Sequence, residues 1–275
     1  MFQCFTLDTT NGISHIQFNR PERMNSMTKE FWNEFPKAIS EIETAGNTRV
    51  IVISSTGKHF SAGMDLSVFE ANESLNTKTP LNRERLKQLV LFLQSGFNAL
   101  GNARVPVIAA IQGACIGGAL DLVSACDMRY ATKDASFKIQ EINLGMMADL
   151  GGLQRLPNAL PDAILREMAF TGDALPASKA QALGFVNDLY ETSDELIENV
   201  LSVAKKIATQ SPLAISASKE ALNFARDHSL ADALVQCANL QAAIFNERDL
   251  METMRAKKEK NTPNFENLHT QPLSI

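Results

Sequence analysis

The fold of this chain is decided by residues 105–121, which read Val105-Pro106-Val107-Ile108-Ala109-Ala110-Ile111-Gln112-Gly113-Ala114-Cys115-Ile116-Gly117-Gly118-Ala119-Leu120-Asp121. The apolar run from Val107 to Ile111 predicts a strand buried on both faces, as in a parallel sheet. The glycines after it predict a tight turn into a helix that runs through Cys126. Backbone N–H groups at the start of a helix have no partner within it, so they can donate to an anion. Asp121 follows Gly118 by about one helical turn and therefore faces the same opening.

The rest of the chain alternates short apolar strands with helices of regular apolar period. Before the central stretch we predict, in chain order, a hairpin of strands 2–7 and 13–18 turning at Asn11-Gly12, a helix at 28–43, a buried strand at 50–53, a mobile polar loop at 72–82 and a helix at 86–100. From about residue 194 the strand pattern ends, and helices are predicted near 194–209, 213–227, 230–246 and 249–258. These patterns predict an α/β core over residues 1–193 and a helical C-terminal region over residues 194–275.

Composition and charge narrow the class of protein. The 275 residues are 45% hydrophobic and 21% charged, which is typical of a globular protein and not of a collagen-like, disordered or disulfide-rich one. With 26 basic and 31 acidic side chains, the net charge of −5 does not favour nucleic-acid binding. The four cysteines show no metal-binding spacing, and neither a signal peptide nor a membrane span is predicted. We therefore expect a cytoplasmic protein without a metal site.

Two further stretches carry side chains suited to chemistry. The first, His59-Phe60-Ser61-Ala62-Gly63-Met64-Asp65-Leu66, follows the predicted strand at 50–53, and its small residues let a ligand approach the backbone closely. The second, at residues 137–152, holds Glu141 and Asp149 among apolar side chains. Buried acids are rare unless they are paired or functional. Both stretches are therefore candidates for a site that binds and transforms a ligand.

Each of these stretches also has a plainer structural interpretation, which the residues alone leave open. The glycine turns fit ordinary helix–strand packing, Asp121 fits a partner for the helix dipole, and the later acids fit solvated side chains or partners of Arg155. Taken together, two amide-donating turns and three acids predict a different arrangement. The donors would stabilise charge on a carbonyl oxygen while the acids move protons at carbon.

Several short motifs then follow one another along the chain: Asn19-Arg20-Pro21, Met24-Asn25-Ser26, and the stretches at 60–66, 117–121, 126–130, 151–157 and 211–212. In this order they resemble the crotonase (enoyl-CoA hydratase/isomerase) superfamily over nearly the whole chain. The resemblance implies an α/β fold, a spiral of repeated ββα units, followed by helices that pack between the subunits of a homotrimer, often doubled to a hexamer. It also implies an acyl-CoA thioester substrate and no metal or redox cofactor, since coenzyme A is part of the substrate.

The resemblance also extends to individual residues. The backbone N–H groups of Met64 and Gly118 match the oxyanion hole of the family, which polarises the thioester carbonyl. Residues 61–65 match the stretch that contacts coenzyme A, and Met64, Met146 and Met147 are expected to line the acyl pocket. The complete set expected to bind coenzyme A or substrate is Arg23, Met24, Ser61, Ala62, Gly63, Met64, Asp65 and Ala119.

The phosphates of coenzyme A need local positive charge in an acidic chain. Arg23 is one candidate for the nucleotide end, and a cluster of Arg255, Lys257 and Lys258 is another. The alternative for each is a solvated helix face.

The three acids resemble those of the dienoyl-CoA isomerase branch of the superfamily. That branch carries Asp, Glu and Asp where Asp121, Glu141 and Asp149 stand, whereas ordinary hydratases carry Glu at the first two positions and Gly at the third. We therefore expect an enzyme of the fatty-acid β-oxidation type that isomerises 3,5-dienoyl-CoA to 2,4-dienoyl-CoA, with these three acids as catalytic residues. The alternatives are an enoyl-CoA hydratase and a non-catalytic acyl-CoA-binding relative, while the charge balance disfavours an RNA-binding one.

Overall fold

The computed structural model describes residues 2–69, 75 and 77–270. Strands and helices alternate as far as residue 190, and only helices follow. The strands are β1 (Phe5–Thr10), β2 (Ile13–Phe18), β3 (Val50–Ser55), β4 (Val107–Ile111), β5 (Ala114–Ile116), β6 (Met128–Thr132), β7 (Ser136–Lys138), β8 (Leu175–Pro176) and β9 (Asp188–Tyr190). The helices are α1 (Lys29–Ala45), α2 (Pro80–Asn102), α3 (Gly118–Ser124), α4 (Gly152–Arg155), α5 (Asp162–Thr171), α6 (Ala177–Ala182), α7 (Ser193–Ala208), α8 (Pro212–Asp227), α9 (Leu230–Ile244) and α10 (Glu247–Glu259).

The main sheet has six strands in the order β1-β2-β3-β4-β6-β9. β1 runs antiparallel to β2, and all later pairings in this sheet are parallel. Every residue of β3 and β4 is buried, which confirms the prediction of strands covered on both faces. A second sheet, β5-β7-β8, begins directly after β4 and so carries the chain from the main sheet to the glycine turn at residue 117.

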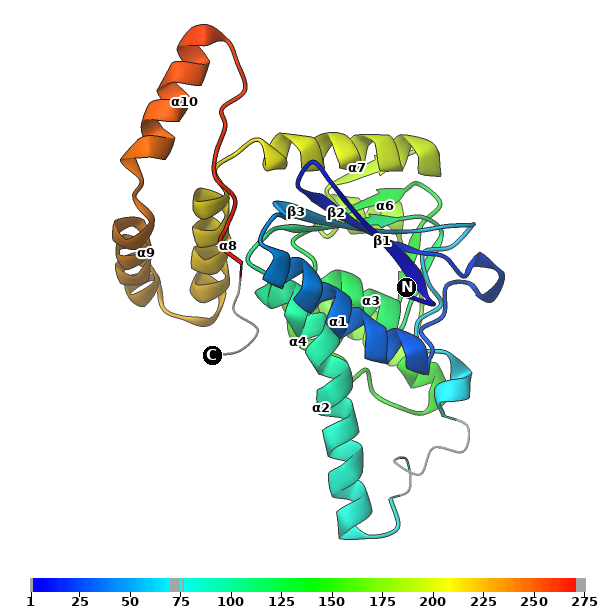
Figure 1. Cartoon of the computed structure of the whole chain (residues 1–275). Coiled ribbons are helices and arrows are strands. Elements are labelled where there is room, and N and C mark those ends of the chain that lie inside the picture. Colours follow the sequence, from blue (N-terminus) through cyan, green and yellow to red (C-terminus); the bar gives the residue numbers. More distant parts are fainter. Residues whose placement is uncertain (1, 70–74, 76, 271–275) are drawn as a thin grey trace.

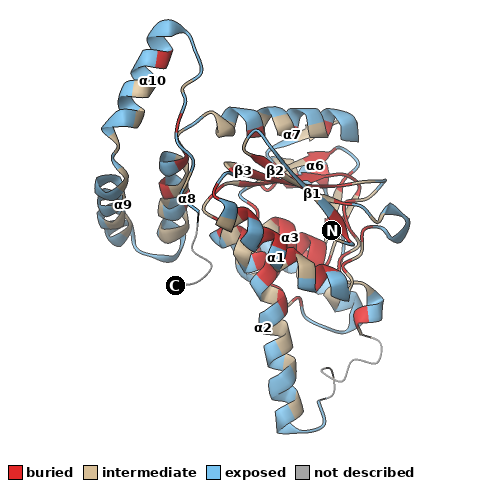
Figure 2. Ribbon diagram, in the orientation of Figure 1, coloured by how far each residue is buried: buried red, intermediate tan, exposed pale blue. Residues whose placement is uncertain are grey.

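Helices cover both faces of the main sheet (Figure 1). α7 packs Leu196, Val200 and Ala204 against one face, where they meet Val50 and Val52. α1, α2 and α3 bury the larger core with the other face, and Figure 2 shows the buried residues concentrated in the sheet and on the helix surfaces turned toward it. α7 lies within the predicted helical C-terminal region, yet its apolar face is part of the sheet packing.

The N-terminal hairpin is confirmed, but its first strand begins at Phe5 instead of Phe2 and also ends later than predicted. β1 extends to Thr10, which pairs with Ile13, so only Asn11 and Gly12 form the turn. Their φ angles of 53° and 77° are the left-handed values that a two-residue hairpin turn requires. The sequence therefore located the turn correctly but ended the first strand three residues early.

The polar loop predicted at 72–82 is wrong at its end. Residues 80–82 form the first turn of α2, where Pro80 occupies a position that favours proline and the Thr79 hydroxyl accepts a hydrogen bond from the Asn82 N–H at 3.2 Å. Residues 72–74 and 76 of the predicted loop lie outside the described residues.

The last three helices stand away from the sheet. α8 packs against α9, α10 extends beyond them, and the chain after residue 260 returns beside α10 (Figure 1). Together with α7, these helices confirm the predicted succession of four C-terminal helices.

No helix of the described ranges is both long and apolar enough to cross a membrane.

A buried lysine ties α8 to the core. The Lys219 side chain is only 7% exposed, and its Nζ lies 2.8 Å from a carboxylate oxygen of Asp127. The same ammonium group donates to the backbone carbonyls of Leu100 and Val105, at 3.2 and 3.0 Å. All three protons of the ammonium group therefore have acceptors on segments more than 90 residues away in sequence.

Candidate active site

The candidate active site is a cavity of about 320 Å³ whose walls come from segments far apart in the chain. α2 supplies an apolar wall, because its side chains at positions 86, 89, 90 and 93 recur at helical spacing and face the cavity. The other walls are the turns that hold Ala62, Met64, Gly117 and Gly118 and the chain between 140 and 150. The three stretches that the sequence singled out are thus brought together around one space.

The two predicted oxyanion donors lie side by side at this cavity. A Cβ atom placed on Gly118 would lie 3.7 Å from the backbone nitrogen of Met64. Within the described part of the chain, no group accepts a hydrogen bond from the N–H of Met64 or of Gly118. Gly118 is the first residue of α3, where the helix leaves its N–H groups unpaired. Two unused donors therefore border one cavity, as an oxyanion hole requires.

Glycine at position 63 makes this approach possible. Its φ is +79°, and a Cβ there would lie 2.4 Å from the carbonyl oxygen of Ile116 and 2.9 Å from the nitrogen of Gly118. A side chain would thus collide with the backbone and close the gap between the two donors. The turn at 61–64 and the start of α3 can come together only because this position has no side chain.

Ser61 holds the first turn in place rather than lining the cavity. Its buried hydroxyl accepts a hydrogen bond from the Gly63 N–H at 3.0 Å and donates to the carbonyl of Asn25 at 2.8 Å. The Ala62 N–H donates to the carbonyl of Met24 at 2.9 Å, so the segment at 24–25 supports the turn from behind. Of the stretch expected to contact coenzyme A, Ala62 and Met64 line the cavity.

Asp65 is likewise occupied by neighbouring protein groups. Its carboxylate accepts hydrogen bonds from the Ser26 hydroxyl at 2.6 Å and from the Ser67 N–H at 3.0 Å. These bonds favour the charged form and lower the pKa of Asp65 to about 2. Asp65 is therefore charged at neutral pH and braces the end of the turn.

Two of the three predicted catalytic acids, Glu141 and Asp149, line the cavity directly. Glu141 opens a short 3-10 helix, Glu141–Leu144, and a Cβ on Gly117 would lie 3.0 Å from one of its carboxylate oxygens. Its other oxygen is buried with no hydrogen-bond partner among the described residues. The Glu141 carboxylate is therefore held against the start of α3 with one oxygen unpaired.

Asp121 lies behind the other two acids rather than at the mouth of the cavity. Its side chain is 3% exposed, and one carboxylate oxygen accepts a hydrogen bond from the Gly152 N–H at 2.6 Å. The second oxygen is buried without a partner in the described structure. The expectation that Asp121 faces the opening is therefore corrected: helix α3 turns its carboxylate inward, toward the start of α4.

Burial in this apolar setting raises the pKa of all three acids. The effect is largest for Asp121, where burial first, and then the nearby charge of Glu141, raises the pKa to about 8. Burial is also the main cause that raises the pKa of Glu141 and of Asp149. Asp121 therefore holds a proton at neutral pH, which removes one of three like charges from the site.

Two residues that support the acids were not predicted. A Cβ on Gly152 would lie 2.3 Å from the Asp121 carboxylate, so glycine is required there for the N–H to reach it. The Gln94 side-chain amide donates to the backbone carbonyl of Asp149 at 2.6 Å and fixes that segment to α2. Gly152 belongs to a motif noted in the sequence, whereas Gln94 sits in an ordinary helical pattern and gave no signal.

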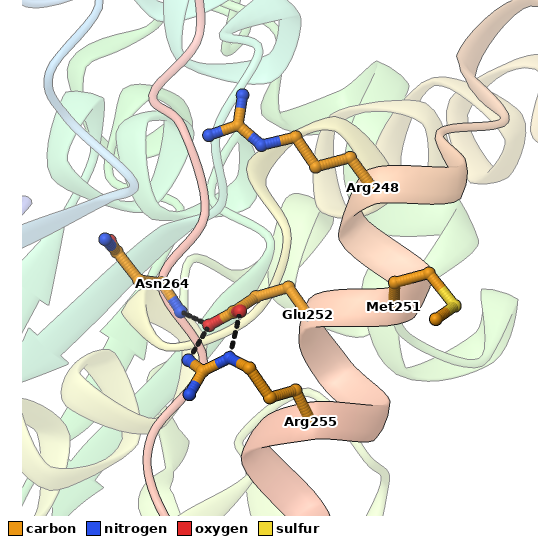
Figure 3. A pocket seen from close by; sticks show the side chains of 5 residues that line it. All are labelled: Arg248, Met251, Glu252, Arg255 and Asn264. Carbon is orange, nitrogen blue, oxygen red and sulfur yellow. Dashed lines mark hydrogen bonds and ion pairs between the residues drawn. The ribbon is translucent and has the colours of Figure 1, made fainter.

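The predicted basic residues do not border this cavity. Arg23 is exposed on a 3-10 helix, Pro21–Arg23. Ala119, which was also predicted to bind coenzyme A or substrate, is buried within α3. Arg255 forms two hydrogen bonds of 2.8 Å with Glu252 (Figure 3). It also pairs with Glu259. The charge of Arg255 is thus balanced within α10, while Lys257 and Lys258 are exposed at its end. No group of three or more potential ligands in the described ranges could hold a metal ion.

Known proteins are similar to this chain over nearly its whole length. The family model described as enoyl-CoA hydratase/isomerase matches residues 8–268. A Delta(3,5)-Delta(2,4)-dienoyl-CoA isomerase named as peroxisomal, from Arabidopsis thaliana, is 37% identical and covers 95% of each chain. One named as mitochondrial, from Homo sapiens, is 35% identical over 93% of this chain and 80% of its own. A solved enoyl-CoA hydratase from Bacillus anthracis superposes with a TM-score of 0.86 at 29% identity, over 96% of this chain and 99% of its own. The chain therefore belongs to the enoyl-CoA hydratase/isomerase family of enzymes, the crotonase superfamily.

Proposed function

We propose that this enzyme isomerises 3,5-dienoyl-CoA thioesters to 2,4-dienoyl-CoA thioesters. The observation that carries the proposal is that Glu141 and Asp149 line the same cavity as the unused N–H groups of Met64 and Gly118. Moving two conjugated double bonds requires a proton to leave one carbon and another to arrive at a distant carbon. Two acids along one cavity, next to a site for the thioester oxygen, meet that requirement.

In the proposed reaction the thioester oxygen lies between the N–H groups of Met64 and Gly118. The Glu141 carboxylate removes a proton from C2, and the electron pair of that C–H bond delocalises over the dienolate as far as C6. The protonated carboxyl group of Asp149 then donates its proton to C6, which leaves the double bonds at C2 and C4. The raised pKa of Asp149 favours the protonated form that this step needs.

Each turnover leaves Glu141 protonated and Asp149 ionised, so a proton must return before the next one. Both acids border an open cavity, and water exchange supplies that route. We propose that Asp121 is a third acid of the catalytic site and that it influences the protonation states of Glu141 and Asp149. Its proton, held by burial and by the charge of Glu141, keeps the local charge low enough for one neighbour to ionise at a time.

We also propose that the enzyme works as a homotrimer or a hexamer of two trimers. α9 has no buried residue and exposes large apolar side chains, among them Leu230, Leu234 and Val235. An apolar surface of this kind is typical of a contact between proteins. Light scattering on the purified protein would measure the subunit number, and a monomer would contradict this part of the proposal.

The test of function is a direct comparison of two substrates. We expect the purified protein to convert 3,5-octadienoyl-CoA much faster than it hydrates crotonyl-CoA. Faster hydration would favour the hydratase, and binding of both thioesters without turnover would favour a non-catalytic acyl-CoA-binding protein. Of the stretch 61–65, Ala62 and Met64 line the cavity, and we propose that they contact coenzyme A together with Arg23. The cytoplasm is the proposed compartment, which cell fractionation would test.

A further inference from the structure

A second apolar groove adjoins the catalytic cavity. Its volume is about 360 Å³, and its lining combines six residues of the segment 139–148 with Leu153 and with Ala169 and Phe170 at the end of α5. Every lining residue is apolar or a glycine. Such a groove offers no partner to a phosphate, a ribose or an adenine, and it fits a hydrocarbon chain.

Two methionines separate the groove from the catalytic cavity. Met146 and Met147 line both spaces, so the two cavities meet at these side chains. Met147 is 65% exposed and is not fixed within the core. Methionine side chains are unbranched and flexible, and they adapt to an apolar ligand that passes beside them. A Cβ on Gly145 would have no atom within 4 Å, so the backbone here leaves open space.

The groove also leaves a large aromatic side chain uncovered. Phe170 is 69% exposed, and Ile142 and Met146 beside it are 41% and 40% exposed. Contiguous exposed apolar surface is unfavourable in water unless something covers it. Because this surface meets the cavity that holds Glu141 and Asp149 at Met146 and Met147, a bound substrate is the occupant that the geometry favours.

We propose that the groove binds the saturated end of a long acyl chain, so that the enzyme prefers long-chain 3,5-dienoyl-CoA substrates. This inference rests on the proposed function. The catalytic cavity holds the thioester and the diene, and the carbons beyond C6 pass Met146 and Met147 to reach Leu153, Ala169 and Phe170. Each methylene group that leaves water strengthens binding roughly fourfold, so even two or three buried groups give a preference of tenfold or more.

The test compares chain lengths. We expect kcat/KM for 3,5-hexadecadienoyl-CoA to exceed that for 3,5-octadienoyl-CoA by at least tenfold in the wild-type enzyme. Phe170→Glu places a charge in the groove, and its exposed position allows the protein to fold. It should lower the long-to-short ratio of kcat/KM about tenfold, whereas the matched control Phe170→Leu keeps the groove apolar and should retain the ratio.

Binding of unreactive thioesters separates this inference from the proposed function. Palmitoyl-CoA should bind at least tenfold more tightly than octanoyl-CoA by calorimetry, and Phe170→Glu should remove most of that difference. If no dienoyl-CoA is isomerised but the difference in binding holds, the proposed reaction fails and the groove stands. A long-to-short ratio near one, or a Phe170→Glu variant that changes the subunit number and affects both chain lengths equally, would overturn the groove as an acyl site.

Discussion

Replacing Gly118 with proline tests the oxyanion hole. Gly118 is the first residue of α3, a position where proline fits because the N–H that it removes has no partner within the helix. No described group accepts a hydrogen bond from this N–H. The substitution therefore deletes one of the two donors and sets a ring carbon in its place, while no hydrogen bond described for the fold is donated by the N–H that is lost.

The expected loss is large for catalysis and small for stability. Removing one oxyanion-hole donor typically lowers kcat by 10²–10³, which corresponds to about 2.7–4 kcal/mol. The proline ring also occupies the space of the thioester oxygen, so acyl-CoA binding should weaken as well. We expect kcat for 3,5-octadienoyl-CoA to fall at least a hundredfold, while the free energy of unfolding changes by less than about 1 kcal/mol.

Gly118→Ala is the matched control, because it keeps the N–H. Its Cβ would lie 3.6 Å from the sulfur of Met27 and 3.8 Å from a methyl carbon of Leu150, which are ordinary contacts. Turnover is followed by the absorbance of the conjugated 2,4-dienoyl thioester, and stability by urea unfolding. A folded Gly118→Pro enzyme with kcat within tenfold of wild type would refute the assignment of this N–H to the oxyanion.

Three other perturbations test the acids and the attachment of α8. Glu141→Gln and Asp149→Asn should each lower kcat by 10²–10⁴ and leave octanoyl-CoA affinity within about threefold by calorimetry; wild-type turnover in either variant would exclude that residue. Burial raises the pKa of Asp121 to about 8, whereas the unfolded chain has a pKa near 4, so folding takes up a proton between about pH 4 and pH 8. The free energy of unfolding therefore falls as pH rises through that window, by at most about 1.4 kcal/mol per pH unit. Urea unfolding of Asp121→Asn across this range should show a smaller slope, and an unchanged slope would contradict the assignment. Lys219→Met should lower the free energy of unfolding by roughly 3 kcal/mol, because the buried carbonyls of Leu100 and Val105 lose their donor and Asp127 loses its ion pair, and a change below about 1 kcal/mol would show that these contacts contribute little.

Local patterns in the sequence were sufficient for most of the fold. Asn11-Gly12 identified the hairpin turn because few residue pairs adopt its left-handed angles without strain. The continuous apolar runs at β3 and β4 identified buried parallel strands, since only a sheet covered on both faces tolerates them. The start of α2 was missed because its first turn is polar, and its proline and threonine fit a loop as well as a helix start.

The sequence by itself determined which elements form, and through its motifs it determined the family and the two turns that carry the donors of Met64 and Gly118. Only the tertiary structure decided where each acid lies relative to the cavity: Glu141 and Asp149 border it, while Asp121 lies behind them. The reason is physical. Secondary structure depends on neighbours within a few residues, whereas burial, charge and hydrogen-bond partners are set by segments that are distant in the chain.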